Sequence, residues 1–273
     1  MASVSPNTVD VGQSSIYRLA IQDPDASSVP STASQLDASS SEVTIVFLRQ
    51  ALFANRSEAG RVLAQRLLGF KDQRPLILAL PRGGVPVGFE VARMLAAPLD
   101  LVLVRKIGAP FQPELAIGAV VDGARAETVL NQEMVREFQI PESYLADESA
   151  RQLEEIERRR ELYLAGTTRA PVEGHTAIVV DDGIATGATM EAAVHAIRRA
   201  NPKHLVLAVP VAPPDTIERL RPQVDEVVCL AMPRLFGAIG AFYEEFQQLS
   251  DEDVVDLLRQ AAWSEREATA PPS

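Results

Sequence analysis

Short apolar runs recur along the chain from Thr44 onward, and longer amphipathic stretches separate them. A short, continuous apolar run is typical of a strand that is buried on both faces. The expected strands are Leu76–Leu80, Asp100–Val104, Leu115–Val121, Ile178–Val180, Leu205–Val209 and a run near Val227. Because helical stretches alternate with these runs, the pattern predicts an α/β fold, with a mostly parallel, twisted sheet flanked by helices on both faces.

The first amphipathic stretch predicts a helix that ends at Gly69. Ser57 is expected to cap this helix, because a hydroxyl at this position accepts a hydrogen bond from a free backbone N–H group. Val62, Leu63 and Leu67 follow at the spacing of one inward face.

Residues 127–166 break the alternation of strands and helices. Much of this segment is the charged run DESARQLEEIERRRELYLAG, in which Glu and Arg recur at helical spacing beside a thin apolar seam of Leu153, Ile156 and Leu162. We expect a helical insertion of one or two helices, solvated and crossed by salt bridges. A contact in a homodimer, or a lid over a substrate, is the alternative role.

The two ends of the chain differ in composition from its middle. Residues 1–42 are rich in Ser and carry few large apolar side chains, so they are predicted to form a disordered tail. The folded domain is expected to span residues 43–263, and residues 264–273 are expected to form a flexible C-terminal tail.

Composition narrows the classes of partner. The formal net charge of −11 argues against a long basic face, and therefore against nucleic-acid binding. Cys229 is the only cysteine, which fits a reducing compartment. No apolar run approaches the roughly 18 residues that span a bilayer, and the start of the chain lacks the pattern of a secretory signal. We therefore expect a cytoplasmic protein that does not contact a membrane.

The segment TAIVVDDGIATGAT, Thr176–Thr189, carries the clearest chemical signal. It predicts a buried strand ending in two adjacent acids, Asp181 and Asp182, followed by a loop of small residues and a helix. Ligands of open α/β sheets bind beyond the carboxyl ends of the strands, and a helix N-terminus suits a phosphate. The acids would repel that phosphate unless they face sugar hydroxyls or a hard cation such as Mg²⁺. The segment matches neither the Walker A loop nor G-x-G-x-x-G.

Two further motifs follow strands. PRGG, Pro81–Gly84, offers glycine N–H groups and the charge of Arg82, which together suit a pyrophosphate group. Arg105 and Lys106 end another strand, and residues 108–113 are expected to form a connecting loop because they contain Gly and Pro. A plain turn, and a solvated basic pair, are the alternative interpretations.

The strings PRGGVPVG, RKIGAP with PELAIGAV, and VVDDGIATGAT together resemble the type I phosphoribosyltransferase family, over Ala51–Leu258. The resemblance implies an enzyme of nucleotide metabolism that binds 5-phosphoribosyl-1-pyrophosphate (PRPP) and Mg²⁺. It would transfer the phosphoribosyl group to a small nitrogenous base or amine and release pyrophosphate.

The resemblance also implies roles for individual residues. Asp181 and Asp182 would hold the ribose hydroxyls, and would hold Mg²⁺ directly or through water and those hydroxyls. The 5′-phosphate would be bound by Ala185, Thr186, Gly187, Ala188 and Thr189. Pyrophosphate would be gripped by Arg82, Gly83 and Gly84, often through an unusual peptide geometry. A mobile loop would close over PRPP, and the catalytic residues would be Arg82, Arg105 and Lys106.

One departure leaves the acceptor open. Ala185 stands where the hypoxanthine-guanine enzymes of this family carry an acid near the purine. Phe236, Phe242 and Tyr243 are candidates for stacking on a base, with packing as the alternative. Hydrolysis of PRPP or a related sugar phosphate, and non-catalytic sensing of PRPP or a nucleotide, are the alternative functions.

Overall fold

The computed structural model describes residues 51–122, 127–164 and 169–269. The chain divides into two units, residues 1–45 and 46–273, and the described residues belong to the second. The predicted tail of residues 1–42 therefore lies outside the described residues. Within the described ranges, no helix combines the length and the apolar character that crossing a membrane requires.

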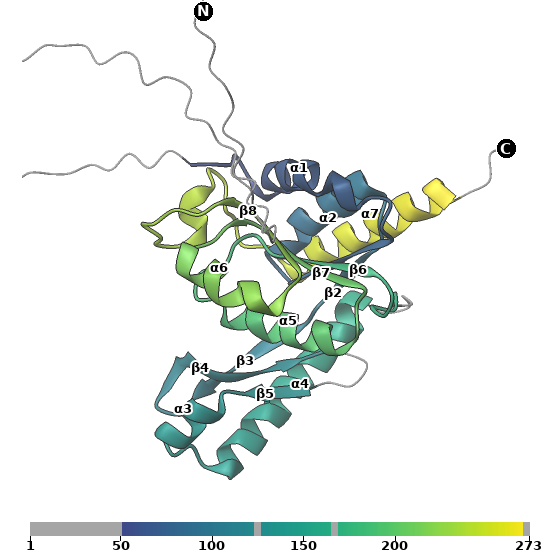
Figure 1. Ribbon diagram of the computed structural model, residues 1–273. Helices are drawn as coiled ribbons and strands as arrows, with labels where there is room; N and C mark the ends of the chain where they lie inside the picture. Colours follow the sequence, from purple (N-terminus) through teal and green to yellow (C-terminus); the bar gives the residue numbers. More distant parts are fainter. Residues whose placement is uncertain (1–50, 123–126, 165–168, 270–273) are drawn as a thin grey trace, which may run out of the picture. The chain divides into compact units, whose positions relative to one another are not determined.

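A five-stranded parallel sheet forms the centre of the fold (Figure 1). Its strands, in spatial order, are β2 (Leu99–Leu101), β1 (Pro75–Ala79), β6 (Thr176–Val180), β7 (His204–Val211) and β8 (Glu226–Ala231). Every residue of β1 and β6 is buried, because helices cover both faces of these strands. The predicted fold class is confirmed, and the apolar runs at β1, β6, β7 and β8 were read correctly.

The helices pack on the two faces in separate groups (Figure 1). One group contains α1 (Arg56–Leu67) and α2 (Gly84–Leu95), which pack on Ile77 and Ile178. The other contains α5 (Ala188–Arg199) and α6 (Pro214–Leu220), which pack on Leu76 and Leu78. Successive residues of a strand point to opposite faces, so β1 supplies both cores.

A second, antiparallel sheet was not predicted. Its strands are β3 (Val104–Ala109), β4 (Gln112–Val121) and β5 (Glu127–Leu130). The run Asp100–Val104 was predicted as one strand, but β2 ends at Leu101 and Val104 begins β3. Leu101, Val102 and Leu103 are all buried, so the hydrophobic pattern gives no sign of where the chain passes from one sheet to the other.

Residues 108–113 form most of a tight hairpin instead of the predicted connecting loop. Gly108 and Ala109 remain in β3, and Gln112 and Pro113 already belong to β4. A side chain at Gly108 would place its Cβ 2.3 Å from the Pro113 carbonyl oxygen. Glycine is therefore required at position 108 because β3 and β4 approach closely there. The same glycine made the sequence resemble a loop.

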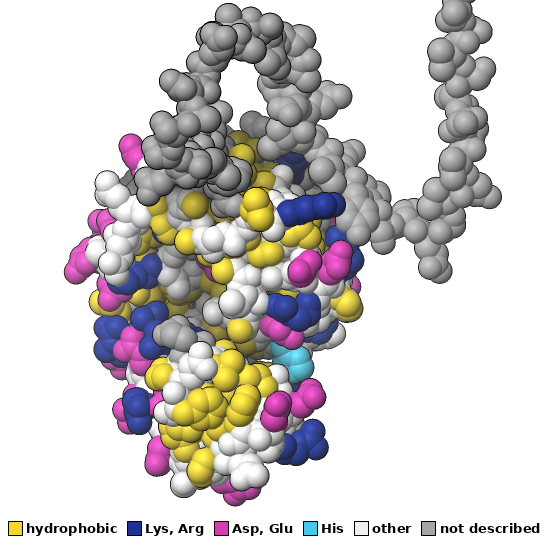
Figure 2. Space-filling model, turned by 90° about the vertical axis from the view of Figure 1, so that its left-hand side faces the viewer, with side chains coloured by type: hydrophobic (Ala, Val, Ile, Leu, Met, Phe, Trp, Pro, Cys, Tyr) yellow, Lys and Arg dark blue, Asp and Glu magenta, His cyan; other side chains and the backbone are white. Residues whose placement is uncertain are grey.

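The inserted segment contains a strand as well as the predicted helices. After β5 come α3 (Gln132–Glu137) and α4 (Glu142–Leu164), while residues 165–168 lie outside the described ranges. Salt bridges join Glu155 of α4 to Arg158 and Arg159, as the charge pattern predicts. These partners lower the pKa of Glu155 to about 2. Figure 2 shows hydrophobic side chains gathered on the lower part of the molecule, where this second sheet lies.

One predicted helix cap is wrong, and one helix extends past the predicted end of the domain. Asn55, not Ser57, caps α1, because its side chain accepts a hydrogen bond from the Glu58 N–H group at 3.0 Å. Helix α7 (Asp251–Thr269) continues past residue 263, where the domain was predicted to end. Its Val254 is buried against the second sheet and α4, so tertiary packing supports the helix. Short 3₁₀ turns occupy Leu68–Phe70, Arg221–Gln223 and Ile239–Phe242.

Candidate functional site

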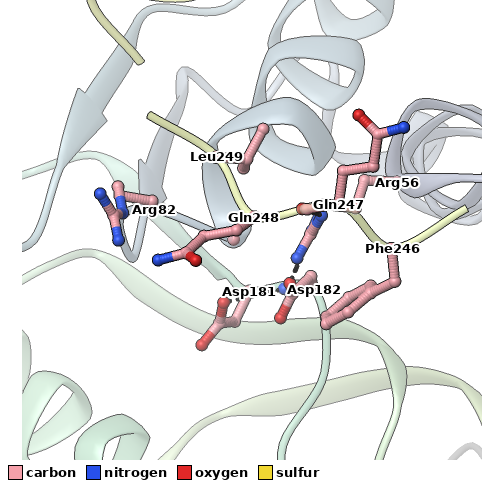
Figure 3. Close-up of a pocket in the computed structure, with 9 residues that line it drawn as sticks. Arg56, Arg82, Asp181, Asp182, Phe246, Gln247, Gln248 and Leu249 are labelled. Carbon is pink, nitrogen blue, oxygen red and sulfur yellow. Dashed lines mark hydrogen bonds and ion pairs between the residues drawn. The ribbon is translucent and has the colours of Figure 1, made fainter. Parts of the chain in front are cut away.

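A cavity of about 390 Å³ opens where β1 and β6 end (Figure 3). Its lining comes from the loops after these two strands, from the start of α1, and from the segment that precedes α7. The lining residues are Arg56, Arg82, Gly83, Asp181, Asp182, Phe246, Gln247, Gln248 and Leu249. The cavity lies at the position where open parallel sheets bind their ligands.

The two predicted motifs meet in this cavity although they are far apart in sequence. β1 and β6 are parallel neighbours, and Ala79 pairs with Val180, so the loops that follow them start side by side. A Cβ at Gly83 would lie 2.2 Å from Oδ2 of Asp182, and one at Gly84 would lie 2.7 Å from the Val180 carbonyl oxygen. Only glycine, which has no Cβ, lets the loop after β1 lie this close to the end of β6. The peptide bond between Pro81 and Arg82 is cis.

Asp182 is buried and paired. Figure 3 shows Arg56 pointing at the Asp182 carboxylate, to which its Nε donates at 2.7 Å. Both side chains are close to nine-tenths buried. The guanidinium of Arg56 also lies over the Phe246 ring, 3.7 Å from its centroid, and donates to the Gln247 carbonyl at 2.8 Å. Burial raises the pKa of Asp182, and the Arg56 charge opposes that shift. This carboxylate therefore connects the strand end to α1 and to the segment before α7.

Asp181 is in a different environment from its neighbour. One of its carboxylate oxygens, Oδ1, accepts a hydrogen bond from the Asp182 N–H group at 2.8 Å. Burial, and then the negative charge of Asp182, raise the pKa of Asp181 well above its ordinary value. A carboxyl group whose charge is disfavoured in this way favours a cation or a hydrogen-bond donor arriving in the cavity.

The predicted phosphate loop follows the acid pair directly. Gly187 caps α5 with a φ of +83°, and a Cβ there would lie 2.8 Å from the Thr216 side chain. Thr216 donates to the Ala185 carbonyl at 2.9 Å, and Arg219 donates to the Thr186 carbonyl. Ala185, Thr186 and Thr189 are exposed, Gly187 is buried and Ala188 is half-buried. These residues do not line the cavity, but they form an ordered loop at a helix N-terminus.

The structure does not bring Arg105 and Lys106 to the cavity. Arg105 donates from Nε to Oε1 of Gln152 in α4 at 2.9 Å. Burial is the largest of the causes that lower the pKa of Arg105. Lys106 is exposed and, as the next residue of β3, points to the opposite face of the sheet. Their catalytic roles stay predictions.

Sequence reasoning missed the other wall of the cavity, which consists of Arg56 and residues 246–249. Of the three aromatic residues singled out earlier, Phe242 and Tyr243 are each 5% exposed and pack against Phe53 and Ala59. Phe246 lines the cavity instead. Tyr243 is close to these residues in chain order, but no local spacing marks 246–249 as part of a site.

These features define an α/β protein with a glycine loop and an acid pair at the carboxyl edge of a parallel sheet. Residues 49–239 match the family described as the phosphoribosyl transferase domain, and the chain belongs to that family.

Individual relatives agree with this assignment. Two Mycobacterium tuberculosis proteins, "Putative phosphoribosyl transferase Rv0571c" of strain H37Rv and "Putative phosphoribosyl transferase MT0597" of strain CDC 1551, are each 49% identical over 211 residues. The match covers 77% of this chain and 47% of each relative, so the chain spans about half the length of these curated relatives. The crystal structure of TT1426 from Thermus thermophilus is 45% identical, with a TM-score of 0.67, and covers 76% of this chain and 98% of that one.

Proposed function

We propose that this chain binds PRPP with Mg²⁺ and transfers the phosphoribosyl group to a small nitrogenous acceptor, releasing pyrophosphate. One observation carries the proposal: the acid pair after β6 and the glycines after β1 are in direct contact at the edge of a single cavity. The two motifs serve different parts of one ligand, because acids suit sugar hydroxyls and glycine N–H groups with Arg82 suit phosphates.

The contacts of the two acids support a finer division of the proposed roles. Asp182 already accepts a hydrogen bond from Arg56, so Asp181 is the acid that is better placed to receive a ribose hydroxyl. Asp182 would act partly through Arg56, by holding α1 over the cavity. Residues 185–189 would hold the 5′-phosphate, because a helix N-terminus offers N–H groups to an anion. Arg82, Gly83 and Gly84 would hold the pyrophosphate.

The donor set fits a magnesium ion that is shared with the substrate. Among the described residues, no group of three or more His, Cys, Asp and Glu side chains is placed to hold a metal. Mg²⁺ usually takes one or two carboxylates and fills its other positions with substrate phosphates and water. Asp181 fits this pattern, with Asp182 as the second carboxylate or through water. A cation would offset the burial and, after it, the Asp182 charge, which together raise the Asp181 pKa. When bound, the ion would neutralise charge on the pyrophosphate.

The reaction would depend on charge stabilisation. Pyrophosphate gains negative charge as its bond to ribose C1 breaks, so Arg82 and the adjacent backbone N–H groups would act more strongly in the transition state than in the ground state. Closure of the β3–β4 hairpin would bring Lys106, or Arg105 after release from Gln152, to the same group. Two unit charges about 4 Å apart interact by about 1 kcal/mol in water but about 4 kcal/mol at an effective dielectric near 20, so closure would strengthen each contact.

The acceptor would bind against the second wall of the cavity. Phe246 offers a ring face, and Gln247 and Gln248 carry amide groups able to donate and accept hydrogen bonds. No acid stands at Ala185 to act as a base near a purine. We therefore propose a nitrogenous base or amine of another kind. We also propose that the domain spans residues 43–263, with α7 continuing beyond that end, and that the protein acts in the cytoplasm.

The test is a screen of bases and amines for pyrophosphate release that depends on PRPP and Mg²⁺, with a no-acceptor control. Release that requires one acceptor would support transfer, and release without any acceptor would identify a hydrolase. Binding of PRPP without turnover would identify a sensor. The matched variant is Asp181→Asn, which keeps the shape of the side chain and its bond to the Asp182 N–H group. If this folded variant bound PRPP as tightly as the parent, the site assignment would be wrong.

A further inference from the structure

The inserted helix α4 has a contact that leads toward the candidate site. Tyr163, near the C-terminal end of α4, is 4% exposed, and its hydroxyl donates to Oδ1 of Asp251, the first residue of α7. The same Oδ1 lies 3.6 Å from Nη1 of Arg82. A buried tyrosine, a carboxylate and the arginine of the PRGG loop therefore form one chain of contacts.

The position of Asp251 is fixed independently of Arg82. Ser250 and Asp253 cap α7 by themselves: the Ser250 N–H group donates to Oδ2 of Asp253 at 2.8 Å, and the Asp253 N–H group donates to the Ser250 hydroxyl at 3.1 Å. The Asp251 carboxylate is therefore not needed as a cap. It is about one quarter exposed and oriented by the Tyr163 hydroxyl, so it presents a fixed negative charge to Arg82.

Helix α4 is well suited to hold such an anchor. The Tyr144 hydroxyl, near its start, donates to the Gly108 carbonyl at 2.8 Å. Arg160, one turn before Tyr163, pairs with the fully buried carboxylate of Asp122. Burial, and then the hydrogen bond to Asp251, raise the pKa of Tyr163 to about 12, so the hydroxyl keeps its proton at neutral pH.

We propose that α4 positions Arg82 for the pyrophosphate group, through Tyr163 and Asp251. This inference rests on the proposed function, because it assigns Arg82 to pyrophosphate. An arginine side chain loses rotamer entropy when it binds an anion. A fixed carboxylate behind the guanidinium already restricts the side chain in the free protein, so less entropy is lost when the ligand binds. The guanidinium has five N–H donors, so contact with one carboxylate oxygen leaves donors for a ligand. Tyr163 and Asp251 are positioning residues, not catalytic ones.

The test is calorimetry on the full chain with inorganic pyrophosphate and Mg²⁺. We expect the Kd for pyrophosphate to rise about fivefold in Tyr163→Phe and about tenfold in Asp251→Asn. Both variants keep the shape of the side chain. Asp256→Asn is the matched control and should leave the Kd unchanged. Asp256 is an exposed aspartate of the same helix, and it forms a local ion pair with Arg259.

A second ligand distinguishes a loss of Arg82 positioning from a general loss of structure at the site. Ribose 5-phosphate lacks the pyrophosphate group, so its Kd should be the same in Tyr163→Phe, Asp251→Asn and the parent. In an Arg82→Ala background, Tyr163→Phe should cause no further loss of pyrophosphate affinity, because the residue that it positions is gone. Equal loss of both ligands would show a structural role and overturn the inference.

Two other outcomes are equally decisive. Tighter pyrophosphate binding in Asp251→Asn would show that Asp251 withholds Arg82 from the ligand instead of presenting it, and would overturn the inference. If the parent bound pyrophosphate but not PRPP, the proposed function would fail, and the variants would still test the positioning of Arg82. Binding of neither ligand to the parent would overturn both.

Discussion

The two sheets of this molecule hold their candidate residues in different ways. In the parallel sheet, Asp181, Asp182 and Gly83 follow strands that are buried on both faces, and backbone pairing of β1 with β6 sets their separation. In the antiparallel sheet, Arg105 is oriented by a side chain of α4, and Lys106 is exposed. Substitutions of the residues that follow β1 and β6 should therefore change stability and binding together. Substitutions of Arg105 and Lys106 should change turnover with little effect on stability.

The largest effect is expected at the Arg56–Asp182 pair. Asp182→Asn leaves the Arg56 guanidinium buried without its counter-charge, which typically costs about 3–5 kcal/mol of folding free energy. Chemical denaturation would measure the loss. Arg56→Met in the same chain should recover part of it, because no unpaired charge then remains. A loss below about 1 kcal/mol in Asp182→Asn would show that this pair does not hold the site together.

The second prediction concerns the antiparallel sheet. If the hairpin closes over pyrophosphate, Lys106→Ala should lower kcat about a hundredfold, because a preorganised donor to developing charge contributes about 3 kcal/mol. Its melting temperature should stay at the parental value. Thr189→Val should mainly raise KM, since the 5′-phosphate has the same charge in both states. Steady-state kinetics with the identified acceptor would decide. A change confined to KM in Lys106→Ala would contradict the assigned role.

The third prediction tests the close approach of the hairpin strands. Gly108→Ala should destabilise the protein by about 1–3 kcal/mol, because its Cβ would meet the Pro113 backbone oxygen at 2.3 Å. Gly237→Ala is the matched control, since no atom lies within 4 Å of the Cβ position there. Thermal unfolding of both variants would measure the difference. Equal stability of the two would show that β3 and β4 separate without cost.

The same contrast explains how far the sequence could predict the molecule. Ile178–Val180 and Leu76–Leu80 are continuous apolar runs followed by glycines and acids, so the buried strands and both motifs were identified from local pattern. The antiparallel sheet was missed because Leu101–Leu103 are apolar throughout while the chain changes sheets. Arg56 and Phe246 were missed for another reason: they reach Asp182 through tertiary packing of α1 and the segment before α7, which no local spacing encodes.

The smallest effect is expected at Asp181, and its sign is opposite to that at Asp182. The folded state raises the Asp181 pKa, so it binds this proton more tightly than the unfolded chain does. Stability is therefore lost as the pH rises from the ordinary aspartate value of about 3.9 toward the raised value in the folded protein. Asp181→Asn removes this loss and should stabilise the unliganded protein at neutral pH by about 1 kcal/mol.

The pH dependence provides the check on Asp181→Asn. Near pH 4, Asp181 is largely protonated in the folded state, so the variant and the parent should melt at similar temperatures. At about pH 8 the variant should melt at the higher temperature, while its affinity for PRPP should be lost. Together these results would show that the negative charge of Asp181 lowers the stability of the unliganded fold and is needed for binding PRPP. A variant that melts below the parent at both pH values would instead show that the carboxylate of Asp181, like that of Asp182, stabilises the strand end.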